Sequence, residues 1–152
     1  MKRILLIVTL LVVSVSTMLA QKGLSVAEQF DGSKPYFATA TRVWVEGSEL
    51  KRYNLTLYKS ITVKDNADAA SEMENAVKQD AHKAVSKEIG HLKGRLFYAF
   101  LCLNGSRGSN RYVFYRNSLL SEGGKNEVTL VYMEGQVTMS QLKEMFTQKS
   151  NK

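Results

Sequence analysis

Apolar and polar positions alternate with period two along several segments of the chain, and this alternation predicts β-strands. The expected strands cover residues 37–45, 55–64, 95–103, 111–117 and 127–133. The segment 95–103 is apolar at nearly every position, which is typical of a central strand covered on both faces. Short glycine-containing connections at 104–110 and 121–126 join the last three strands and indicate an antiparallel meander.

Other segments repeat their apolar residues every three or four positions, which predicts amphipathic helices. The longest covers 67–89, with Asp65 or Asn66 as its N-cap and Gly90 just past its end. Two shorter helices, 24–30 and 139–148, each begin with a sequence that fits a capping box. These boxes are Ser25–Glu28 and Thr138–Gln141, and a single helical turn is expected at 48–53. The predicted fold class is α+β, an antiparallel sheet of about five strands with one long and two shorter flanking helices.

The first twenty residues have the pattern of a secretory signal peptide. Met1 to Arg3 is basic, residues 4–15 are almost wholly apolar, and small residues lead to Ala20. Cleavage is expected near the Ala20–Gln21 bond. The alternative is an uncleaved membrane anchor, but the apolar run is shorter than the ~20 residues of a spanning helix.

These boundaries predict a single α+β domain over residues 21–152, with no transmembrane segment in the mature chain. Position 21 is Gln21 and not cysteine, which excludes a lipobox-type lipid anchor. The sole cysteine, Cys102, permits no disulfide within the chain. The expected location is therefore the bacterial periplasm.

Charge narrows the range of partners. Without Lys2 and Arg3 the chain has 19 basic and 14 acidic residues, so its formal net charge falls from +7 to +5. The charges are scattered, which is typical of a soluble surface and permits only weak binding to an anionic surface. Nucleic acid is not an expected partner of an exported protein.

No arrangement of residues indicates catalysis, a cofactor or a metal site. His82 and His91 are nine residues apart, which is not the spacing of a helical zinc pair. Cys102 lies in an apolar run, where a thiol is a core residue more often than a nucleophile. The acidic residues lie near turns or apart on a helix, so none has the apolar setting of a general acid.

One set of residues combines aromatic contact area with polar or cationic groups, and this combination favours a binding face. Its members are Trp44, Tyr58, Tyr98, Arg111, Tyr112 and Arg116. The alternative is that the aromatic members are core residues and cross-strand pairs. Trp44, the only tryptophan, is the expected exposed anchor if the face exists.

Two stretches resemble a known group of proteins. Residues 127–142 read as a strand, a glycine turn and a capped helix, and residues 50–60 read LKRYNLTLYKS. They resemble small exported proteins of Bacteroidetes, the DUF6108 and DUF4252 types, with 50–60 closer to the first. The resemblance implies an exported domain without an assigned activity or functional residues. The DUF4252 type is often a lipoprotein, and this chain differs because it has no cysteine at position 21, where the lipid would be attached.

The sequence thus favours an exported, non-enzymatic binding or interaction module of the bacterial envelope, whose partner is an envelope protein or a glycan. Two alternatives stay open. One is a structural subunit of an envelope assembly, and the other is a hydrolase-like enzyme that uses Cys102 or dispersed carboxylates.

Overall fold

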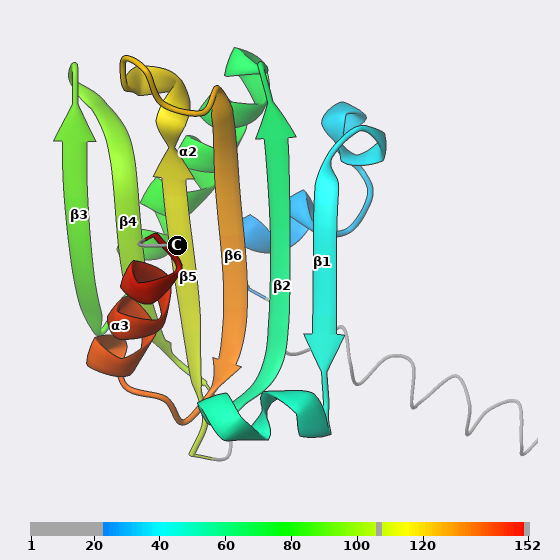
Figure 1. Ribbon diagram of the computed structural model, residues 1–152, viewed down its shortest axis with the longest axis vertical. Coiled ribbons are helices and arrows are strands. Elements are labelled where there is room, and N and C mark those ends of the chain that lie inside the picture. The colour runs from blue at the N-terminus through cyan, green and yellow to red at the C-terminus, as the bar shows by residue number, and fades with distance from the viewer. Residues whose placement is uncertain (1–22, 106–107, 151–152) are drawn as a thin grey trace, which may run out of the picture.

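A computed structural model describes residues 23–105 and 108–150, whose strands form one antiparallel sheet in the order β1-β2-β6-β5-β4-β3 (Figure 1). The predicted signal peptide lies outside these residues. The strands are β1 (Thr41–Glu46), β2 (Leu55–Lys64), β3 (Ser86–Leu92), β4 (Arg95–Asn104), β5 (Asn110–Asn117) and β6 (Glu127–Gly135). Two α-helices lie on opposite faces, α2 (Ala67–Ala81) and α3 (Met139–Ser150). We call these faces the α2-side and the α3-side face.

The sheet has six strands rather than the predicted five or so, and the additional strand is β3. The expected helix over 67–89 ends at Ala81, and Ser86–Leu92 pairs with β4 instead. The pairing begins where the Val85 N–H donates to the Cys102 carbonyl at 2.9 Å. It gives the backbone groups on this edge of β4 their partners, which outweighs a modest helix propensity. Gly90 and His91 are therefore strand residues, and the predicted helix end at Gly90 is wrong.

The meander predicted for the carboxy-terminal half is confirmed and extended. Strands β3, β4, β5 and β6 pair in chain order, and β6 then pairs with β2. Strand β4 is covered on both faces, as expected. Leu101 is buried in the α2-side core and Phe100 in the α3-side core.

Helix α2 and the segment before β1 pack on the α2-side face of the sheet. Asn66 caps α2 as predicted, because its side chain accepts from the Ala69 N–H at 2.9 Å. Met73 and Val77 of its apolar stripe are fully buried. Asp80, also buried, accepts from the Ser25 and Val26 N–H groups at 2.7 and 2.9 Å. It thereby ties the amino-terminal segment to the helix.

That segment differs from expectation in two ways. Ser25–Gln29 forms a short 3-10 helix, η2, and the Ser25 hydroxyl donates to Gln79 on α2 instead of forming a capping box with Glu28. Residues 37–40 do not belong to the first strand. Pro35, whose fixed φ suits the start of a helix, opens a second 3-10 helix, η3 (Pro35–Ala38).

The remaining connections include two further 3-10 helices. The turn expected at 48–53 is confirmed as η4 (Ser48–Tyr53), and η5 (Ser118–Leu120) follows β5. In the described part of the chain, no helix is both long and apolar enough to cross a membrane.

Helix α3 begins with the predicted capping box. The Thr138 N–H donates to Gln141 Oε1 at 3.0 Å, and the Gln141 N–H donates to Thr138 Oγ1 at 3.1 Å. Leu142 is fully buried in the α3-side core. The helix lies in front of the lower part of β4 and β5 and leaves the upper part of this face without a covering helix (Figure 1).

Candidate binding surface

Strand register places four of the six predicted binding residues on the α3-side face. Tyr98 lies opposite Arg116 across β4 and β5. Tyr112 and Tyr58 each lie opposite Met133, one on either side of β6. On this face, Tyr112 thus lies near the start of β5, and the pair of Arg116 and Tyr98 lies near its other end.

Tyr112 belongs to the core and not to an exposed surface. Its side chain is 1% exposed, and its hydroxyl donates to the Val137 carbonyl just before α3. Burial raises the pKa of this phenol above its usual value. Tyr58 is half-buried against the same core, so neither tyrosine presents a free ring.

Tyr98 and Arg116 form an accessible cluster with Phe97. The Arg116 guanidinium carbon lies 5.4 Å from the centroid of the Phe97 ring, a cation–π distance. The rings of Phe97 and Tyr98 meet edge to face, with centroids 6.4 Å apart. Arg116 is exposed, and Phe97 and Tyr98 are half-buried, so their rings are partly accessible. We call Phe97, Tyr98 and Arg116 the aromatic–basic patch.

The sequence pattern missed Phe97 because strict alternation places it on the α2-side face. The register of β3 against β4 shifts between Gly90 and His91, so that Phe97 is an extra residue between Leu96 and Tyr98. A bulge of this kind reverses the alternation locally. An isolated glycine inside a strand is the signal that could have shown the bulge. Gly90 has that role, but the helical pattern before it hid the strand.

The position of Tyr98 depends on Gly90. The Tyr98 ring lies against this glycine, where any Cβ would overlap the ring. The Tyr98 hydroxyl lies 3.4 Å from Glu88 Oε1. Glu88 in turn pairs with Lys143 of α3, whose hydrogen bond lowers the pKa of the Glu88 carboxyl. The patch therefore borders α3 and is oriented by both β3 and α3.

Trp44 and Arg111 do not join this patch, because they lie on the α2-side face. Trp44 is 60% exposed in β1, and Lys59 of β2 places its Nζ 3.8 Å from the indole centroid. Burial lowers the pKa of Lys59, against the opposite influence of Glu134 and Glu46. Arg111 Nε donates to the Asn104 carbonyl at 2.8 Å. The predicted set is thus divided between the two faces.

The cysteine and the two histidines considered for catalysis lie on different elements of the fold. Cys102 is buried, and desolvation raises the pKa of its thiol, which disfavours the thiolate. His82 caps the end of α2 and His91 lies in β3, both exposed. Within the described residues, no three His, Cys, Asp or Glu side chains gather as metal ligands would.

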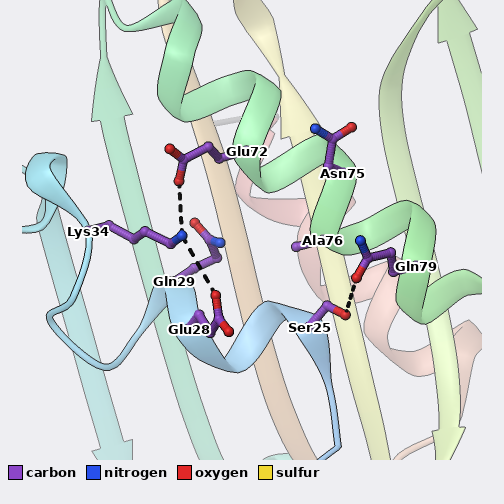
Figure 2. Close-up of a pocket in the computed structure, with 8 residues that line it drawn as sticks. All are labelled: Ser25, Glu28, Gln29, Lys34, Glu72, Asn75, Ala76 and Gln79. Atoms are coloured by element: carbon purple, nitrogen blue, oxygen red, sulfur yellow. Dashed lines mark hydrogen bonds and ion pairs between the residues drawn. The ribbon is translucent and has the colours of Figure 1, made fainter.

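A polar cleft that the sequence did not indicate lies between α2 and the η2–η3 segment. Its lining is Ser25, Glu28, Gln29, Lys34, Glu72, Asn75, Ala76 and Gln79 (Figure 2). Most of the charged and amide groups engage one another. Lys34 lies 3.3 Å from Glu72 and 3.7 Å from Glu28, and the Ser25 hydroxyl donates to Gln79 at 2.7 Å.

The cleft measures about 220 Å³, which is below the ~300 Å³ at which ligand pockets begin. Ligand pockets are also mostly apolar, whereas Ala76 is the only apolar residue here. The contacts therefore serve to dock the amino-terminal segment on α2.

Comparison with known protein families gives a match. The model of the Family of unknown function (DUF6108) matches residues 13–146. The chain belongs to this family. No curated protein matches it.

Membership of DUF6108 confirms one part of the resemblance seen in the sequence. The match includes β1 to β6 and thus all three patch residues. The family carries no activity that could be assigned to the patch, so the function has to be argued from the site. The DUF4252 type and the Bacteroidetes origin stay predictions.

Proposed function

We propose that this DUF6108 protein is an exported, non-enzymatic binding module of the bacterial envelope that recognises an envelope protein or a glycan through its aromatic–basic patch. The observation that carries the proposal is that Phe97, Tyr98 and Arg116 cluster at the start of β4 and the end of β5. Helix α3 does not lie in front of this end of the two strands (Figure 1).

The chemistry of the patch suits recognition. Partly accessible aromatic rings supply apolar contact area, and the guanidinium supplies donors for carboxylate, phosphate or carbonyl oxygens. The rings are held in place, because Tyr98 lies against Gly90 and Arg116 lies over Phe97. A surface ordered before binding loses less entropy when a partner docks.

Export rests on the amino-terminal pattern of a basic start, an apolar run and small residues before Gln21. Intact mass measurement of the protein recovered from its native cells tests this part separately. We expect a mature amino terminus at Gln21. Recovery of the chain with Met1 to Ala20 still attached would contradict export by a cleaved signal peptide.

Site-specific photocrosslinking tests the binding site. A photoreactive phenylalanine derivative replaces Tyr98 in one sample and Tyr53 of η4 in a matched control, where the side chain is 37% exposed. After irradiation in the native envelope, we expect a discrete adduct from position 98 only, which disappears when Arg116→Ala is added. Its mass distinguishes a protein from a glycan. Identical adducts from both positions, or none from position 98, would contradict the proposal.

A structural subunit of an envelope assembly is the second candidate, and one observation favours it. Val43 and Trp44, on the end strand β1, are 44% and 60% exposed, although large apolar side chains are usually covered.

A further inference from the structure

Strand β1 ends the sheet with an unpaired edge. Among the described strands its only neighbour is β2, and Figure 1 shows it at the margin of the sheet. An edge strand presents unpaired backbone N–H and C=O groups, which are a template for another strand. Proteins usually protect such edges with charges, proline or a bulge.

The two edges of this sheet differ in protection. Strand β3 has a register shift between Gly90 and His91 and exposes the charged side chains of Lys87 and Glu88. Strand β1 pairs with β2 without a shift. Besides the charged Arg42 and Glu46, it exposes Val43 on one face and Trp44 on the other. Only β1 is therefore regular and apolar enough to pair further.

Hydrogen bonds at the ends of the neighbouring ladders show which β1 residues point outward. The Gly47 N–H donates to the Thr56 carbonyl, and the Asp65 N–H on the opposite side of β2 donates to the Asn126 carbonyl. Residues of an antiparallel strand point alternately to its two neighbours. Both hydrogen bonds indicate the same alternation. In it, the backbone N–H and C=O groups of Arg42, Trp44 and Glu46 point away from β2.

We propose that β1 pairs in antiparallel fashion with β1 of a second copy of this chain, centred on Trp44. In this register Arg42 lies opposite Glu46 of the second copy, and Glu46 lies opposite its Arg42. Trp44 faces its own counterpart, and Val43 lies opposite Val45. Cross-strand pairs of opposite charge and of apolar side chains both stabilise a sheet.

The charge pattern selects this register over the others that the outward phase allows. A slide of two residues separates both ion pairs, and a slide of four places Arg42 against Arg42 or Glu46 against Glu46. Like charges directly opposite one another are destabilising. Five residues of β1, Arg42 to Glu46, thus carry a self-complementary sequence, RVWVE, with Trp44 at its centre.

The pairing closes on itself. Two sheets of six strands become one continuous sheet, and β1 of each copy is then covered. The two-fold axis is perpendicular to the sheet, so both α3-side faces turn to the same side. A contact of five residues from each strand is short, and we expect a concentration-dependent dimer rather than a permanent one.

Sedimentation equilibrium of the protein expressed from Met1 tests the proposal through a charge exchange. Arg42→Glu and Glu46→Arg each create two like-charge pairs, so each should raise the dissociation constant of the dimer about tenfold or more. The double variant restores opposite charges in every pair and should return the constant to the wild-type range. Circular dichroism of each variant verifies its fold, since Arg42 also lies 4.2 Å from the Phe37 ring.

Three results would overturn the inference: a monomer at every concentration, a dimer that tolerates both single changes, or a double variant that does not recover. Oxidative crosslinking provides a second test with unchanged charges. Trp44→Cys should form a disulfide dimer, because opposite Cα atoms in a hydrogen-bonded pair are ~5.5 Å apart. Val43→Cys is the matched control, since it faces Val45, and equal crosslinking of both would contradict the register.

Discussion

The two faces of the sheet differ in how completely the chain covers them. On the α2-side face, helix α2 and η2 leave even the polar anchors buried, and Asp80 and Glu74 are 0% and 3% exposed with their carboxylates satisfied. On the α3-side face the twelve-residue helix α3 covers only part of the sheet and leaves the start of β4 and the end of β5, which carry the aromatic–basic patch, without a covering helix. The first face is completed within the chain where α2 and η2 pack on it, although Trp44 on β1 is 60% exposed, and the second face is open to a partner.

The covered part of the α3-side face should stabilise the fold as a normal core does, and Leu142→Ala tests this most strongly. Leu142 is fully buried, so the change should lower the free energy of unfolding by ~3 kcal/mol. Urea unfolding measures the loss. Glu144→Ala, on the exposed side of α3, is the control and should change stability by less than ~0.5 kcal/mol. Equal effects of the two changes would show that α3 is not docked.

The α2-side anchors should respond to pH, and Glu74→Gln tests one of them. Burial alone would raise the pKa of Glu74, but hydrogen bonds from Arg95, Lys78 and the Leu96 N–H outweigh it and lower the pKa. The charged form is therefore stabilised by folding, and at pH 7 the change should cost ~2 kcal/mol.

The sign of the pH dependence follows from that lowered pKa. The contribution of Glu74 is present above the unfolded value of about 4.3 and is lost as the pH falls through the lower folded value. Urea unfolding at pH 7 and at pH 3 should show the gap between wild type and Glu74→Gln becoming smaller at pH 3. A gap that stays constant would contradict the role of the charged carboxylate. Glu72→Gln, at a more exposed ion pair, is the comparison.

Gly90→Ala tests whether Gly90 holds the Tyr98 ring in place on the α3-side face. A Cβ at this position would overlap the Tyr98 ring, so the substitution should cost ~1–2 kcal/mol. In a Tyr98→Ala background the overlap is absent, and the same substitution should cost less than ~0.5 kcal/mol. Thermal unfolding of the four proteins measures the coupling. Equal costs in both backgrounds would show that Tyr98 does not lie over Gly90.

Sequence patterns predicted the elements whose local signals agree with their surroundings. Strand β2 has the predicted bounds, Asn66 caps α2, and Thr138 with Gln141 forms the expected capping box. At both helix starts the side chain that marks the element is also the one that satisfies its backbone. Such local signals are readable without knowledge of the tertiary structure.

The errors arose where pairing between segments decides the structure, even between β3 and β4, which are joined by only Lys93 and Gly94. Residues 86–92 continue a helical pattern, but the open edge of β4 makes them a strand. The bulge at Phe97 follows from that pairing, so the sequence placed Phe97 on the wrong face and missed it as a patch residue. Tyr112 looked like a surface aromatic because nothing local shows that α3 returns to cover it. The sequence thus predicted two of the three residues of the aromatic–basic patch, Tyr98 and Arg116, but not Phe97.

We propose that the aromatic–basic patch recognises a partner and that the fold does not depend on it. The most direct measurement is the retention of purified protein on isolated native envelope, with wild type compared to a Phe97→Ser/Arg116→Ala double variant and a Lys125→Ala control. We predict that the double variant loses retention about tenfold or more, while its free energy of unfolding stays within ~1 kcal/mol of wild type. Lys125→Ala should behave as wild type. Undiminished retention of a folded double variant would contradict the account.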